Sequence, residues 1–163
     1  MKKVYLFLIA ALIGIEIALG AFVAPVVFFP QNFIGEGVLT HFQSGVLMTQ
    51  IFLKYNYVLL AVSVFAFIFD AFGLKGEECV HVRISAFALS FINLALALAF
   101  VFYFTSYILH AQGLGEAATA TDEFRSVHKT SEYVMKIMML AQLFLFFFKF
   151  IGRSPKERGL KEA

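Results

Sequence analysis

The sequence predicts an all-α integral membrane protein, a four-helix bundle within a single domain of residues 1–163. Two observations predict this fold class. Hydrophobic residues make up 61% of the chain, more than the roughly half that is usual for soluble domains. Long, mostly uncharged runs occur four times, and each provides the roughly 20 helical residues that cross a hydrocarbon core. The expected spans are about 4–29, 51–72, 84–109 and 127–151.

The first span resembles the core of a secretory signal, but it is longer than such a core and contains Glu16. We therefore expect a retained span. Near its end, Pro25 removes a backbone donor and frees the carbonyl of Ala21, which predicts a kink or break. The alternative is a simple helix end, with Pro30 as a second stop.

The connection between spans one and two, residues 30–50, predicts a short amphipathic helix on the outer surface. Its apolar residues recur with helical spacing, and they are Val38, Leu39, Phe42, Val46 and Leu47. The second connection, residues 73–82, is short, so spans two and three should be antiparallel neighbours.

Spans three and four are joined by a polar segment that contains glycines and acidic residues. We expect it to become helical at Thr121 or Asp122, because acidic residues suit a helix N-terminus. In span three, Ala86, Ser90 and Ala97 form a small face that favours close helix packing.

Basic residues predict the orientation. Nine of them fall on one side of the predicted membrane: Lys2, Lys3, Lys75, Arg83, Lys149, Arg153, Lys156, Arg158 and Lys161. Only Lys54, Arg125 and Lys129 fall near the other side. The positive-inside rule therefore places both termini in the cytoplasm, in a bacterial inner membrane. Since this asymmetry explains the net charge of +2, no nucleic-acid partner is expected.

Ionisable residues inside the spans are the main evidence for a functional interior. In span four, His128, Glu132 and Lys136 are spaced at i, i+4 and i+8, so a helix places them on one face. Glu16 and Lys136 both fall near mid-depth, and we expect them to form an ion pair.

Other polar residues extend this predicted intramembrane site toward the outer side. Asn93 lies near mid-depth on span three, and Lys54 lies near the outer end of span two. Asp70, near the cytoplasmic end, is expected to meet Lys75 or solvent. Together these positions predict an outward-facing polar cavity.

Three hypotheses follow for the cavity, beginning with a metal or haem site formed by His128, His110 and His41. Imidazole ligands suit copper or haem iron. The second is a pathway for a small solute or protons through the intramembrane polar residues. For this second hypothesis, a homo-oligomer or an outward-facing binding cavity fits better than a complete channel formed by one copy. The third is an accessory or assembly subunit that docks on a larger membrane complex. No compact catalytic motif appears, so an ordinary enzyme is not expected, while a haem-dependent redox enzyme stays open.

Short motifs at three places resemble those of the transmembrane protein 205-like family, a group of small four-span membrane proteins filed as a domain of unknown function. The motifs are Gly20-x4-Pro25-x2-Phe28, then Phe42-x2-Gly45 leading into Ile51-Phe52-x2-Tyr55, and His128-x2-Ser131. The resemblance implies an integral membrane protein of undetermined activity. It maps Pro25, Gly45 and His128 without giving them roles.

Overall fold

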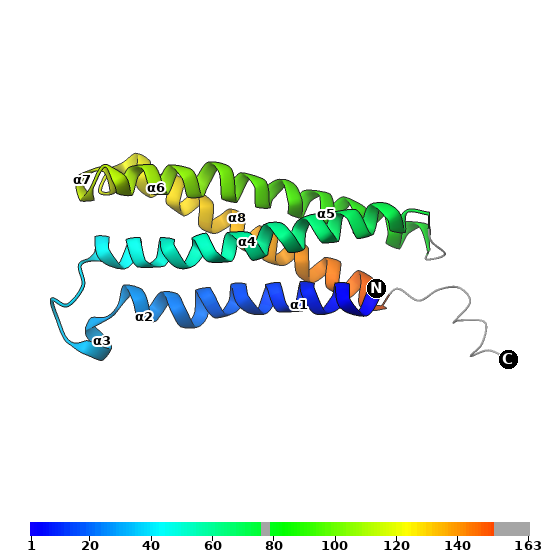
Figure 1. Ribbon diagram of the computed structural model, residues 1–163, viewed down its shortest axis with the longest axis horizontal. Helices are drawn as coiled ribbons and strands as arrows, with labels where there is room; N and C mark the ends of the chain where they lie inside the picture. The colour runs from blue at the N-terminus through cyan, green and yellow to red at the C-terminus, as the bar shows by residue number, and fades with distance from the viewer. Residues whose placement is uncertain (76–78, 152–163) are drawn as a thin grey trace.

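The computed structural model describes residues 1–75 and 79–151, and every regular element within these ranges is a helix. Four helical segments are long and apolar enough to cross a membrane (Figure 1). They are Lys2–Phe28, His41–Gly73, Val80–Gly113 and Asp122–Ile151. The predicted all-α fold with four spans is therefore confirmed. The basic residues from Arg153 to Lys161 lie outside the described ranges.

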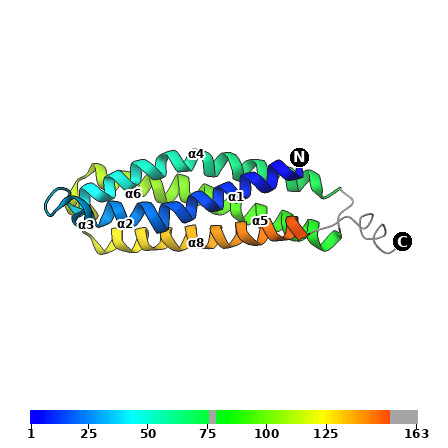
Figure 2. The ribbon, with the colours of Figure 1, turned by 90° about the horizontal axis from the view of Figure 1, so that it is seen from below.

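The four segments form a ring in which each packs against two others. In order around the ring these are α1 (Lys2–Ala18), α4 (His41–Gly73), α5 (Val80–Ala99) and α8 (Asp122–Ile151), and α8 returns to α1. The N-terminus and the last turn of α8 lie at one end of the bundle (Figures 1 and 2). We call this the terminal end. The opposite end, with connections 29–40 and 114–121, is the loop end.

The first span stays helical past its proline. After α1 it continues through a π-helical turn, η1 (Leu19–Val23), into α2 (Ala24–Phe28). Pro25 lies in the first turn of α2, where helices tolerate a missing N–H group best. The break predicted at Pro25 is therefore absent. A π turn instead inserts one extra residue into the helix.

The second span begins earlier than predicted. After the short α3 (Gln31–Ile34), a capping box starts α4 at His41: Gln43 N donates to Thr40 Oγ1 at 3.1 Å, and Thr40 N donates to Gln43 Oε1 at 2.9 Å. The separate amphipathic helix predicted in this connection is therefore wrong, because Phe42, Val46 and Leu47 belong to the first turns of α4, and Val38 and Leu39 precede it outside any helix. With 33 residues, α4 is about 50 Å long.

The third span also contains a π turn. Here α5 continues through η2 (Phe100–Thr105) into α6 (Ser106–Gly113). A positive φ of 102° at Gly115 then turns the chain into α7 (Glu116–Thr119). As predicted, α8 begins at Asp122. The small face of α5 is also confirmed, since Ala86, Ser90 and Ala97 are fully buried.

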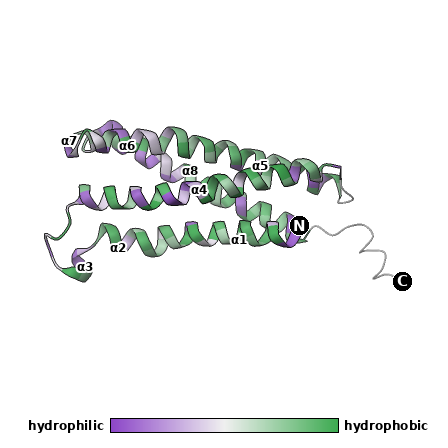
Figure 3. Ribbon diagram, viewed as in Figure 1, coloured by the Kyte–Doolittle hydropathy of each residue, from purple (hydrophilic) through white to green (hydrophobic). Residues whose placement is uncertain are grey.

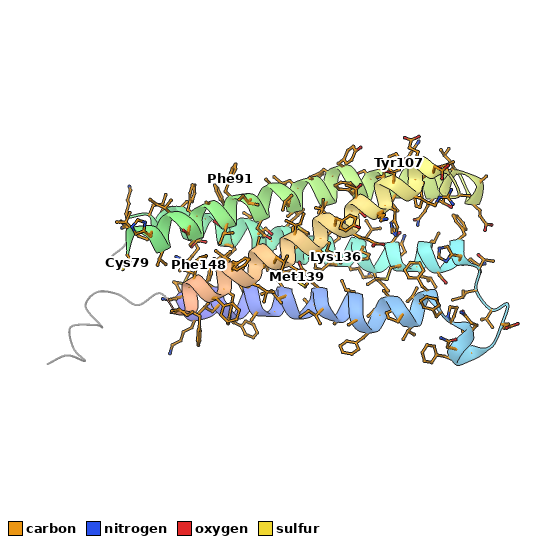
Figure 4. The ribbon with its side chains drawn as sticks, turned by 180° about the vertical axis from the view of Figure 1, so that it is seen from behind. Cys79, Phe91, Tyr107, Lys136, Met139 and Phe148 are labelled. Carbon is orange, nitrogen blue, oxygen red and sulfur yellow. The ribbon has the colours of Figure 1, made fainter. Side chains whose placement is uncertain are left out.

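Polar residues identify the interior of this bundle better than apolar residues do. Apolar residues occur along the length of the spans (Figure 3). Some of their side chains are buried and others are exposed. Phe91, for example, projects away from the bundle and is 56% exposed (Figure 4). By contrast, several polar side chains within the spans are almost completely buried, among them Glu16, Asn56, Ser63, Asp70, Asn93, Gln142 and Lys149.

Candidate functional site

A pocket of about 740 Å³ lies in the loop-end half of the bundle. All four spans and α7 contribute to its wall. The path of α8 explains its position, because α8 packs on α1 toward the terminal end and on α6 and α7 toward the loop end. Figure 1 shows α8 crossing the bundle diagonally between these contacts. The pocket occupies the space that this crossing leaves between α2 and α8.

The pocket wall is mostly apolar, and phenylalanine is the most frequent residue in it. The phenylalanines are Phe28, Phe42, Phe52, Phe100 and Phe124. Polar groups are concentrated in two places. One is the wall of α4 and α6, where Gln112 Nε2 donates to Thr49 Oγ1 at 3.0 Å. The other is the edge formed by α8.

Both π turns border the pocket. Gly20 from η1 lines it, as do Phe100 and Thr105 at the two ends of η2. Thr105 Oγ1 donates to the carbonyl of Phe100 at 2.9 Å and accepts from Asn56 Nδ2 at 3.1 Å. This hydroxyl thus satisfies the backbone of the π turn and joins it to α4. π turns often occur at functional sites.

The polar stripe on α8 forms the second polar part of the wall. The stripe consists of His128, Glu132 and Lys136. Glu132 lies between the other two, with its Oε1 3.5 Å from His128 Nε2 and its Oε2 3.9 Å from Lys136 Nζ. All three side chains line the pocket and are 45–63% exposed. Figure 4 places Lys136 near the middle of α8. The stripe therefore forms an exposed polar edge of the pocket.

Glu16 is paired differently from the prediction. Its Oε1 accepts from Tyr55 Oη at 2.5 Å and from Gln142 Nε2 at 2.9 Å. The predicted ion pair with Lys136 is wrong, because α8 presents Gln142 to Glu16. Lys136 lies six residues nearer the loop end, where its side chain is 63% exposed.

Hydrogen bonds extend from Glu16 to all four spans. Gln142 Nε2 also donates to Asn93 Oδ1 at 3.2 Å, and Asn93 Nδ2 donates to Ser63 Oγ at 3.0 Å. We call Tyr55, Glu16, Gln142, Asn93 and Ser63 the central network. It lies outside the lining of the pocket. The single polar cavity predicted from the sequence is therefore two separate features.

Lys54 belongs to neither feature. It is exposed, while the next two residues, Tyr55 and Asn56, are buried. The prediction that Lys54 faces the interior is wrong, because adjacent residues on a helix point about 100° apart.

α4 carries a polar stripe that was not predicted from the sequence. Thr49, Asn56, Ser63 and Asp70 are spaced by seven residues, and each is at most 8% exposed. A heptad spacing keeps residues on one face of a packed helix. Each of these four side chains forms a hydrogen bond or an ion pair with a side chain of another span. This spacing is readable in the sequence and could have identified them.

The last member of that stripe, Asp70, also corrects a prediction. It is buried, with Oδ1 3.0 Å from Lys149 Nζ, and its Oδ2 accepts from Tyr5 Oη at 2.8 Å. The expected contact with Lys75 or solvent is therefore wrong. Lys149, counted among the basic residues that set the orientation, lies inside the bundle. α1, α4 and α8 thus meet at a polar contact near the terminal end.

The three predicted histidine ligands do not come together. His41 and His128 line the pocket, whereas His110 is exposed and lies off the lining. On α6 the lining residues are Ile108 and Gln112, and His110 falls between them on the opposite face of the helix. Within residues 1–75 and 79–151, no three His, Cys, Asp or Glu side chains form a group that could hold a metal.

A family model matches the chain over residues 7–117, well over half its length. The model is DUF4149, a domain of unknown function. The chain belongs to this family. No curated protein and no solved structure matches the chain.

The DUF4149 match ends within α7, before α8 begins. Glu16, Tyr55 and Asp70 therefore come from the matched region, while Gln142 and Lys149 come from the helix that follows it. Both buried polar contacts join the DUF4149 region to α8. α8 therefore packs against the matched region through buried polar side chains.

Proposed function

We propose that this DUF4149 membrane protein binds an amphipathic small molecule in the loop-end pocket. The pocket itself carries the proposal. Its volume of about 740 Å³ lies within the roughly 300–1,000 Å³ that is usual for small-molecule sites. Such sites combine mostly apolar walls with a few placed polar groups, and this pocket has both.

The lining suggests how such a ligand would be held. An apolar body would pack among the phenylalanines, and a polar group would reach either Gln112 or the stripe on α8. The basic-residue asymmetry supports an orientation with the terminal end in the cytoplasm. In that orientation the pocket faces outward, and a ligand dissolved in the bilayer would enter it laterally between α2 and α8.

The resemblance to the transmembrane protein 205-like family is part of the proposal. Seven residues of its motifs line the pocket: Gly20, Phe28, Phe42, Gly45, Phe52, His128 and Ser131. Pro25, the other mapped residue, lies in the α2 turn between two of them. The motif residues are therefore concentrated at the site where we place the ligand.

The remaining sequence hypotheses stay predictions. A copper or haem site would have to use His41 and His128, and optical and elemental analysis of the purified protein tests it. A homo-oligomer or a larger membrane complex is tested by co-purification after mild solubilisation. The inner-membrane location rests on the orientation argument alone.

Photolabelling tests the pocket. The purified full chain in lipid nanodiscs is irradiated with a diazirine derivative of palmitic acid, and the labelled residues are mapped by mass spectrometry. We expect saturable labelling of pocket residues such as Met48 and Met135, which excess palmitic acid competes away. Lipid-facing Phe91 is the matched control and should label without saturation. Equal, non-saturable labelling at all three positions would contradict the proposal.

A further inference from the structure

We infer that the Glu16 carboxyl is a proton-binding site that exchanges its proton with the loop-end pocket. The inference uses the pocket only as a space, so it does not depend on the amphipathic ligand. Binding adds a proton to a carboxylate oxygen and release returns it to water, without electron transfer.

The charge of Glu16 is the first argument. Its hydrogen-bond partners in the central network are a phenol and an amide, both uncharged. The helices around it offer no free cation within the described ranges. On α8, Lys136 pairs with Glu132 and Lys149 pairs with Asp70; on α4, Lys54 is exposed; and α5 contributes the amide of Asn93 to the network.

A carboxylate in the apolar interior of a membrane protein needs a compensating charge. Glu16 is only 3% exposed, so bulk solvent does not provide that compensation. A proton removes the charge without requiring any further residue. Acidic residues within membrane spans commonly mark proton pathways for this reason.

The hydrogen-bond inventory is the second argument. Oε1 of Glu16 receives two hydrogen bonds, whereas its Oε2 is buried without a partner among the described residues. Oε1 of Gln142 is also buried without a hydrogen-bond partner among the described residues. Both atoms are acceptors, so what the site lacks is a donor. A proton on Oε2 creates one.

A divalent metal ion fits this site less well than a proton. Calcium and magnesium take six or more oxygen ligands. Within the central network only Glu16 Oε2 and Gln142 Oε1 are buried oxygens without a hydrogen-bond partner. The oxygens of Asn93 and Ser63 already accept hydrogen bonds. The inventory therefore favours a proton.

Position along the helices is the third argument. Gly20 lines the pocket and lies one helical turn from Glu16, and Phe52 lines the pocket one turn from Tyr55. Gly20 has no side chain, and a Cβ built there would meet nothing within 4 Å. The pocket therefore has open space at Gly20, one helical turn from Glu16.

Infrared spectroscopy of the full chain in nanodiscs tests the inference. A protonated carboxylic acid gives a C=O stretching band distinct from that of a carboxylate. We expect such a band in the wild type, with an intensity that changes with pH. It should be lost in E16Q and kept in E36Q, which changes an exposed acid at the loop end. No band in the wild type, or an unchanged band in E16Q, would overturn the inference.

Y55F keeps the test decisive if E16Q does not fold. This variant retains the carboxyl and removes one donor to Oε1, so the band should shift in frequency; an unshifted band would place the proton elsewhere. Replacing the potassium salt of the buffer with the sodium salt should leave the band unchanged. Loss of the band in sodium would show that a metal ion, and not a proton, occupies the site.

Exchange of this proton for deuterium tests the route. The exchange should be slower in G20F than in G14F. G20F narrows the pocket one helical turn from Glu16, whereas G14F changes an α1 glycine outside the lining. Equal rates would contradict exchange through the pocket.

Discussion

Asp70 on α4 and Lys149 on α8 form an ion pair of 3.0 Å although their side chains are 0% and 3% exposed. Tyr5 on α1 completes the contact through its hydroxyl. Three spans are thus joined near the terminal end, while the pocket separates α2 from α8 toward the loop end. The bundle is closed at one end and hollow at the other.

Breaking the ion pair should strongly destabilise the protein. Removing one partner from a buried pair typically costs about 3–5 kcal/mol, because the other charge stays buried without compensation. We therefore expect D70N and K149M each to lower the free energy of unfolding by about that amount. Denaturation in mixed micelles measures it.

The matched control for K149M is K129M, which removes an exposed lysine from the same helix. It should change the free energy of unfolding by less than about 0.5 kcal/mol, as is usual for surface substitutions. The double variant D70N/K149M should be more stable than either single variant, since it leaves no unpaired charge. Additive losses would show that the two residues do not interact.

Gln142 should contribute to stability through the central network. It donates to both Glu16 and Asn93, and an interhelical hydrogen bond in a membrane protein contributes about 0.6 kcal/mol on average. We expect Q142L to lose about 1–2 kcal/mol, measured by denaturation in mixed micelles. Q50L, at an exposed position on α4, should lose much less. Similar losses in both variants would argue against the network.

A substitution of Lys136 distinguishes its contact with Glu132 in the structure from the pairing with Glu16 that the sequence predicted. In the structure Lys136 makes an exposed contact with Glu132, and exposed ion pairs are worth roughly 0–1 kcal/mol. K136M should therefore change the free energy of unfolding by no more than about 1 kcal/mol. A loss of several kcal/mol in the same denaturation assay would instead support a buried pair with Glu16.

Gly20 offers a direct test of the pocket. The Cβ of a phenylalanine at this position would meet no atom within 4 Å, and Gly20 lines the pocket, so we expect the ring to occupy pocket space. We expect G20F to abolish saturable photolabelling by the palmitic acid probe.

G14F is the control for G20F, since Gly14 lies on the same helix with equally open space but outside the lining. Its labelling should match that of the wild type. If G20F also labels normally, the probe does not bind in this pocket.

Hydropathy predicted the spans because the length of an apolar run is a property of the chain alone. The same holds for local signals: Asp122 starts α8, and the spacing of the α8 stripe places His128, Glu132 and Lys136 on one face. The capping box of Thr40 and Gln43 was equally local but was missed, so the start of α4 was misplaced.

The partners that residues find on other helices could not be predicted from such local signals. Glu16 and Lys136 were paired by depth, yet the tilt of α8 brings Gln142 to Glu16. Asp70 was matched with a residue near it in sequence, whereas its partner Lys149 is 79 positions away. Neither depth nor sequence distance records how two helices cross.

The sequence by itself therefore determined the fold class, the four spans and the residues that share a face of one helix, because these depend on local composition and helical periodicity. Only the tertiary structure decided which polar groups meet, that the histidines stay apart, and that a pocket forms between α2 and α8. In lipid, apolar faces on the inside and the outside look alike, so the crossing and rotation of the helices settle these contacts.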